Sequence, residues 1–226
     1  MTMPMLLTLA AAAAAGVGIG DFLVLCVHNL PRRRPILAAS PRGRQALVIT
    51  FLTAIVCAGA FWLYGPTPLC IARVVLGSAL IALFAIDLEH RLLPNAITLP
   101  GIAIGFLFSL VIEPGWRSSL AGIAVGGGLP WAVAEIYWRV RRREGVGMGD
   151  VKMLAMIGAF LGWQAALMTL LLASIAGSII GLVVIALRRG DLQYTMPFGT
   201  LLAVGAAVSA VRGQALFEWL AKVAAK

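Results

Sequence analysis

Charged residues are scarce in this chain. Of its 226 residues, 12% are charged and 61% are hydrophobic. Soluble domains are typically about a quarter charged and about half apolar, so this composition excludes a soluble helical domain. A single core of this length could not bury so much apolar surface. The composition instead predicts a protein that crosses a membrane several times.

Cysteine is also sparse, and Cys26, Cys57 and Cys70 are widely spaced. No two of them form a CxxC pair, so the sequence lacks the signature of a zinc site and the framework of a disulfide-rich domain. We expect the three thiols to pack as small apolar groups, and we expect no metal site.

Basic residues are missing from the beginning of the chain, where Arg32 is the first lysine or arginine. The apolar start therefore lacks the positively charged region of a cleaved signal peptide. We expect residues 5–28 to be retained as the first membrane helix.

Apolar stretches of about 20 residues predict an all-α fold with about eight transmembrane helices. The expected helices cover residues 5–28, 46–64, 69–87, 96–113, 119–138, 151–163, 165–187 and 197–212. The short sixth helix is divided from the seventh at Gly162 and Trp163. Residues 213–226 carry apolar side chains at helical spacing and are expected to form an amphipathic helix at the membrane surface. We divide the chain into residues 1–45, the first helix with a basic loop, and residues 46–226.

Basic residues gather in the loops after the first, third, fifth and seventh expected helices. Cytoplasmic loops of membrane proteins carry an excess of lysine and arginine. With eight helices, all the basic loops lie on one side, which predicts an N-terminus outside and basic loops in the cytoplasm. The net charge of +9 follows from this bias and indicates no nucleic-acid partner.

Three aspartates, Asp21, Asp87 and Asp150, lie close to apolar helix, where an ionised carboxylate costs about 2.5 kcal/mol or more. Asp87 ends the third expected helix and Asp150 opens the sixth, so both belong to the same membrane face. Two carboxylates in one cleft would share a proton. The ionised member can activate water while the protonated member binds the scissile carbonyl oxygen, which is the chemistry of an aspartyl protease. The pair would titrate as a unit.

Glycines precede Asp150 in GVGMGD, where Gly145, Gly147 and Gly149 allow close approaches and leave helix N–H groups free. A hinge or tight helix packing explains an isolated GxGD equally well. The similar GVGIGD at 16–21 lies inside the first expected helix, so depth and neighbours must separate the two.

Three blocks resemble the type IV prepilin peptidases, which are GxGD-type intramembrane aspartyl proteases. They are IDLEHRLLPNAITLPG at 86–101, GVGMGDVKMLAMIGAFLGW at 145–163 and MPFGTLLAVGA at 196–206. The resemblance implies Asp87 and Asp150 as catalytic residues and Gly147, Gly149 and Lys152 as active-site motif residues.

The same resemblance implies a bacterial inner-membrane enzyme of type IV pilus assembly or protein secretion. Its substrates are prepilin or pseudopilin precursors, cleaved after a glycine where the basic leader meets the cytoplasmic membrane face. Proteolysis of this kind needs no cofactor. Lys152 has three expected roles, which are polarising the site, meeting acidic or carbonyl groups, and extending to the membrane surface.

The chain departs from many members of that family in the loop at 31–45, which replaces an insert with two CxxC pairs. We therefore expect a compact peptidase without N-methyltransferase activity, and S-adenosylmethionine as a cofactor only if that activity is retained. Asp21 stands where a small serine is common. We expect it to make a structural polar contact inside the bundle, with His28 or Arg73 as partner.

A small proton- or cation-coupled transporter is the main alternative. It would carry internal repeats and acids near the bilayer midplane. The sequences around the two GVGxGD copies share no further pattern, and Asp87 and Asp150 lie at one face. A GxGD protease of signal peptides is a second alternative, against which the Pro94–Asn95 turn and the Pro-Phe-Gly block count.

Overall fold

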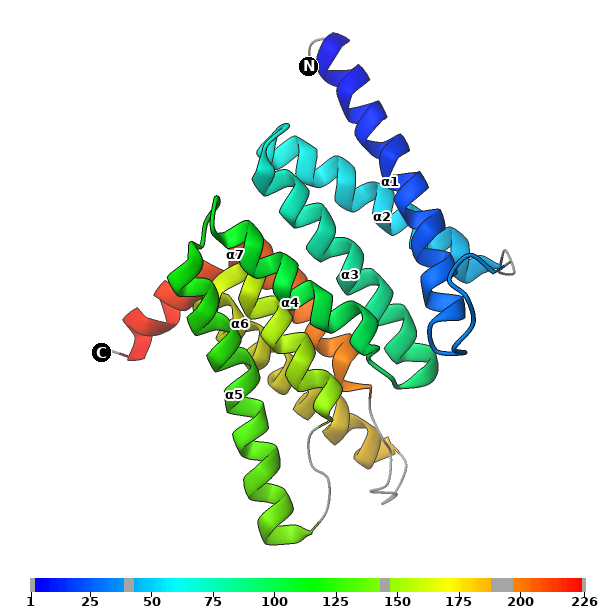
Figure 1. Cartoon of the computed structure of the whole chain (residues 1–226). Coiled ribbons are helices and arrows are strands. Elements are labelled where there is room, and N and C mark those ends of the chain that lie inside the picture. Colours follow the sequence, from blue (N-terminus) through cyan, green and yellow to red (C-terminus); the bar gives the residue numbers. More distant parts are fainter. Residues whose placement is uncertain (1–2, 39–42, 143–146, 188–196, 225–226) are drawn as a thin grey trace.

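The chain is all-α throughout the part described by the computed structural model, residues 3–38, 43–142, 147–187 and 197–224. Figure 1 shows the first three helices grouped beside the other four. The helices are α1 (Met3–Asn29), α2 (Arg44–Tyr64), α3 (Pro68–His90), α4 (Asn95–Ser109), α5 (Trp116–Arg141), α6 (Met148–Leu187) and α7 (Phe198–Ala224). All except α4 are long and apolar enough to cross a membrane, and α4 is a shorter apolar helix. The expected polytopic, all-α membrane fold is confirmed.

Helix α6 consists of two helical segments joined at Gly162, whose backbone is non-helical with φ 82° and ψ 174°. The second segment returns along α7. Near the joint, Ala165 lies beside Gly213, and further on Gly177 lies beside Phe198. The expected division between the sixth and seventh helices is therefore confirmed, because only glycine adopts this positive φ without strain. Counting both segments gives eight helical segments in the described residues.

The end of the chain is helical, as expected. Helix α7 runs without a break to Ala224, so the helix expected from residue 213 onward is the continuation of the helix expected over 197–212. No proline interrupts this stretch, and Gly213 is buried against Ala165, which keeps the helix packed past that point. Phe217 then packs edge-on against Trp163, with ring centroids 5.2 Å apart.

The first segment of α6 forms the centre of the larger core, with Met153, Met156 and Ile157 fully buried. A second apolar cluster joins α1, α2 and α3. The outer surfaces of the helices are apolar as well, and Phe51 and Leu182 are 67% and 68% exposed. Such large exposed side chains fit a lipid environment, because contiguous apolar surface in water promotes association.

Helices α5 and the first segment of α6 pack backbone against backbone. A methyl group on Gly158 would lie 3.0 Å from the Cα of Gly122 and would meet its carbonyl group. Real Cβ atoms do not approach backbone so closely. This contact uses small residues in the way that membrane helices commonly associate.

We expect Gly158→Ala to destabilise the protein by about 1–3 kcal/mol, because the added methyl group must push α5 away from α6. Thermal unfolding in detergent measures the loss. Gly128→Ala is the matched control, since a methyl group there meets nothing within 4 Å and alanine favours helix. Equal unfolding temperatures for the two variants would contradict the packing argument.

Candidate active site

Asp87 lies in the last turn of α3, where its side chain is buried at 5% exposure. The helix ends just beyond it at Arg91, which adopts a left-handed conformation and donates its backbone N–H to the Asp87 carbonyl oxygen at 2.9 Å. The residues that follow, including Pro94, lead directly into α4. This local geometry fixes Asp87 at one end of the helix bundle.

The first turn of α7 holds the Asp87 carboxylate. The backbone N–H of Thr200 donates to Oδ2 at 2.8 Å, and the N–H of Gly199 also points to this carboxylate. Free N–H groups and the helix dipole make a helix N-terminus a natural anion site. The block around Pro197, noted in the sequence only as a resemblance, thus has a physical role in positioning Asp87.

Gly199 permits this approach because it has no side chain. A methyl group on Gly199 would lie 2.9 Å from Oδ2 of Asp87 and 3.0 Å from Cδ1 of Leu93. Any larger residue would separate α7 from the carboxylate or displace it. Gly199 is a site residue that the sequence analysis did not single out, although its Pro-Phe-Gly block was noted.

Asp150 lies in the first turn of α6, where it is half-buried and its backbone N–H donates to the Gly147 carbonyl oxygen at 3.0 Å. A methyl group on Gly147 would lie 3.1 Å from Oδ2 of Asp150, and one on Gly149 would lie 2.8 Å from Cβ of Leu93. Both glycines therefore leave room beside Asp150. Gly145 lies outside the described residues.

Leu93 lies beside both halves of this site. Its side chain is approached by Gly199, which faces the Asp87 carboxylate, and by Gly149, which precedes Asp150. The two carboxylates are close enough to repel each other electrostatically. The expected convergence of Asp87 and Asp150 at one end of the bundle is thus present in the structure. Leu93 carries no chemical signal in the sequence and could be found only from the fold.

Lys152 joins the two sequence motifs. Its Nζ donates to Oδ1 of Asn95 at 2.9 Å, which links α6 to the start of α4. This amide oxygen is a carbonyl group of the kind that Lys152 was expected to meet. It keeps the GxGD helix beside the turn that follows Asp87.

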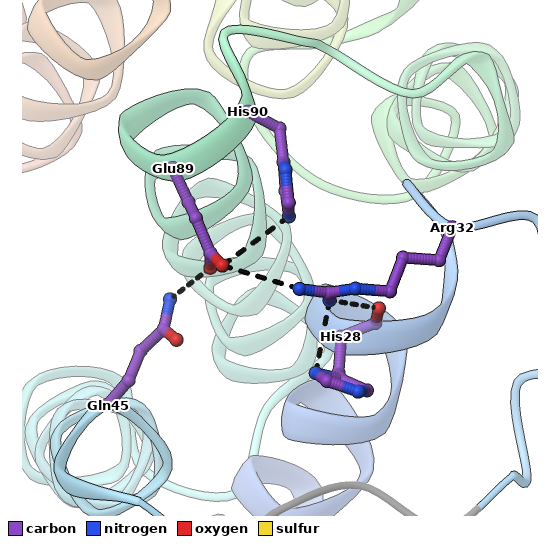
Figure 2. A network of polar contacts seen from close by, with 5 residues as sticks. All are labelled: His28, Arg32, Gln45, Glu89 and His90. Atoms are coloured by element: carbon purple, nitrogen blue, oxygen red, sulfur yellow. Dashed lines mark hydrogen bonds and ion pairs between the residues drawn. The ribbon is translucent and has the colours of Figure 1, made fainter.

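A polar network lies beside the site at the ends of α1, α2 and α3 (Figure 2). Glu89 accepts a hydrogen bond from Gln45 at 3.1 Å and pairs with Arg32 and His90 at 3.5 and 3.7 Å. Arg32 in turn donates to the carbonyl oxygen of His28 at 2.7 Å. Exposed ion pairs each contribute about 0–1 kcal/mol, so the network mainly fixes the relative position of three helix ends.

Asp21 is not part of this site, and its expected partners were wrong. Its side chain is exposed on α1 and accepts a hydrogen bond from the Thr50 hydroxyl at 3.2 Å. His28 instead contacts Arg32, and the Arg73 guanidinium lies over the ring of Tyr64. Thr50 is the partner because α1 and α2 pack closely at Gly20. A methyl group on Gly20 would lie 2.6 Å from the Cα of Thr50.

Asp87 and Asp150 thus lie at the same end of a bundle of apolar helices, which is the arrangement expected of an aspartyl-type site. A family model described as the type IV leader peptidase family matches residues 74–182, a stretch that contains both aspartates and the GxGD motif. No solved structure matches the chain.

Three relatives are each named prepilin leader peptidase/N-methyltransferase. The protein of Burkholderia pseudomallei (strain 1026b) is 34% identical over 176 residues, which are 75% of this chain and 55% of the relative. That of Aeromonas hydrophila is 34% identical over 184 residues, 80% of this chain and 62% of the relative. That of Pseudomonas aeruginosa is 32% identical over 174 residues, 76% of this chain and 59% of the relative.

Residues 74–182 thus match the type IV leader peptidase family, and 75–80% of the chain is similar to proteins named prepilin leader peptidase/N-methyltransferase. Its apolar helices and its relatives make it a multi-pass protein of the inner membrane. The matches to the three relatives extend over 55–62% of their lengths.

Proposed function

We propose that this chain is a prepilin leader peptidase whose catalytic residues are Asp87 and Asp150. The observation that carries the proposal is the meeting of two carboxylates at one end of the bundle, one of them held by the N-terminus of α7. The family match and the names of the relatives support the same activity. The transporter alternative has no such support.

The two aspartates differ in their surroundings, which suits a shared task. Asp87 is buried with Oδ2 fixed by backbone N–H groups, whereas Asp150 is half-buried. In the proposed reaction, the carboxylates share one proton. The ionised carboxylate removes a proton from water, and the protonated one donates a hydrogen bond to the scissile carbonyl oxygen. Gly147, Gly149 and Lys152 keep this end of α6 open and in register with α4.

The proposed substrates are prepilin or pseudopilin precursors. Their basic leader would remain in the cytoplasm while the apolar segment lies in the membrane, so the aspartates would work at the cytoplasmic face. The distribution of basic loops supports this orientation, with the N-terminus outside. Proteolysis would use water alone and no cofactor.

Asparagine at position 87 or 150 should reduce cleavage at least ~1000-fold, because either change removes a proton-transfer group. The measurement is processing of a purified prepilin by the purified protein in detergent. Asp21→Asn is the control and should keep measurable activity, since Asp21 lies outside the candidate site and accepts a hydrogen bond from Thr50. Full activity of Asp87→Asn or Asp150→Asn would refute the assignment.

Gly199→Ala should slow the same cleavage about 10- to 100-fold, because the methyl group displaces the helix N–H donors from Asp87 and a hydrogen bond to a charged group is lost. The matched control is Gly181→Ala in α6, where a methyl group meets nothing within 4 Å. Thermal unfolding of both variants, measured in the same detergent, separates a loss of catalysis from a loss of folded protein. Normal rates with Gly199→Ala would mean that the α7 contact is not needed for catalysis.

We also propose that the chain does not methylate the product. The relatives are named for both activities, but the loop joining α1 and α2 is short and lacks cysteine. Part of this loop is held against α1, because Asn29 is buried and its Nδ2 donates to the carbonyl oxygens of Ile36 and Ala38. We therefore assign S-adenosylmethionine no role unless methylation is found.

Mass analysis of the processed N-terminus, after incubation with S-adenosylmethionine, should show no added methyl group. The cleaved product made without S-adenosylmethionine provides the reference mass. A gain of one methyl group that requires S-adenosylmethionine would overturn this part of the proposal and leave the peptidase assignment intact.

A further inference from the structure

A cavity of about 490 Å³ lies at the end of the bundle opposite the two aspartates. Its walls come from the beginning of α3, the turn between α4 and α5, the α6 joint and the second half of α7. The lining residues that matter here are Arg73, Glu113, Ser209, Arg212 and Gln214. Nothing in the proposed peptidase reaction uses this cavity.

Arg73 is the unusual member of this lining. Its Nε and Nη1 atoms are buried and have no hydrogen-bond partner among the described residues. The guanidinium carbon lies 5.9 Å from the centre of the Tyr64 ring, and Tyr64 also forms a side-chain hydrogen bond with Arg73, so this residue offers a cation–π contact and a neutral partner but no negative charge. A cation in a membrane-spanning helix is costly, and such residues ordinarily face a partner or a cavity.

The other polar groups of the cavity do not supply that partner. The Oγ atom of Ser209 is also buried without a hydrogen-bond partner in the described structure. Glu113 is exposed, and it forms no ion pair with Arg73 or Arg212 in the described structure. Arg212 adds a second positive charge to the lining. Two arginines and one glutamate leave the cavity with an excess of positive charge.

The position of the cavity relative to the bilayer limits which chemical groups can reach it. Arg73 lies five residues after Pro68, the first residue of α3, so it is about 8 Å along the helix from its end. Lipid headgroups occupy roughly the outer 5–7 Å on each side of a hydrocarbon core of about 30 Å. The backbone of Arg73 thus lies inside the edge of the hydrocarbon core, but its guanidinium lies over Tyr64, the last residue of α2, and so reaches toward the depth of the phosphate and glycerol groups.

We propose that this cavity binds a phosphate group, which the arginines recognise by charge-assisted hydrogen bonds. Arginine is well suited to phosphate because its N–H donors are always charged and match several acceptor oxygens. Basic pockets between membrane helices bind phospholipid headgroups in the same way. The phosphate belongs either to a membrane phospholipid or to free phosphate in solution.

The test measures thermal unfolding of the full chain in a non-ionic detergent. One arm adds dioleoyl phosphatidylglycerol, with dioleoylglycerol as the control that has the same acyl chains and no phosphate. A second arm adds inorganic phosphate, with chloride at equal ionic strength as the control. We expect the phosphate-containing ligand to raise the unfolding temperature by about 5 °C. A response to the lipid alone identifies a phospholipid site, and a response to inorganic phosphate identifies a free-anion site.

Arg73→Gln and Arg212→Gln should each remove most of this shift. Arg117→Gln is the matched control, because Arg117 lies at the same end of the bundle but stacks on Trp116 outside the cavity. Native mass spectrometry of Arg212→Gln, counting retained phosphatidylglycerol, provides a second measurement if Arg73→Gln does not fold. The proposal fails if neither ligand stabilises the unmodified protein beyond its control, or if both cavity variants respond fully.

Discussion

A carboxylate buried inside a membrane protein must be given hydrogen-bond donors or lose its charge. At Asp87 the donors are backbone N–H groups from the first turn of α7. These groups would otherwise be unsatisfied, because the first four N–H groups of a helix have no partner within it. This contact therefore provides donors for the buried carboxylate and an acceptor for the free N–H groups at the beginning of α7. It also places Asp87 next to Leu93, which brings the first turn of α6 and Asp150 into the same site.

Close approach at glycine is what makes this arrangement possible. At Gly199 the missing side chain lets a helix end reach a carboxylate, and at Gly149 it lets α6 reach Leu93. In the GVGIGD copy, close approach at glycine serves helix packing. Gly16 and Gly20 of the GVGIGD copy lie against Ala54 and Thr50 of α2, where methyl groups would come within 2.7 Å and 2.6 Å of backbone Cα atoms. The nearly identical hexapeptides GVGIGD and GVGMGD therefore have different roles, because their glycines face different neighbours.

The sequence predicted the helical fold, the joint at Gly162 and the location of Asp87 and Asp150 at the same end of the bundle, because hydropathy and the cost of buried charge act locally along the chain. It predicted a carbonyl partner for Lys152 but did not identify Asn95, because the choice of partner depends on how helices rotate and pack. For the same reason, Asp21 contacts Thr50 rather than the expected His28 or Arg73. Leu93 is invisible to a search for chemical groups, since its importance lies in its neighbours. The helix past Gly213 was predicted, but its continuity with the preceding helix was not, because the buried contact of Gly213 with Ala165 is tertiary.

A buried charge needs compensation at both ends of the bundle, where the charge is negative at Asp87 and positive at Arg73. At one end the negative carboxylate of Asp87 is met by protein N–H groups, so the chain itself supplies the compensation. At the other end two donor nitrogens of Arg73, Nε and Nη1, are buried, and the described residues supply no negative charge beside them. Burial of a charge is tolerated when donors or counter-charges are available, and the protein provides them only where the proposed chemistry takes place. The opposite end then needs compensation from outside the chain, and a phosphate group at headgroup depth is the nearest source in a membrane.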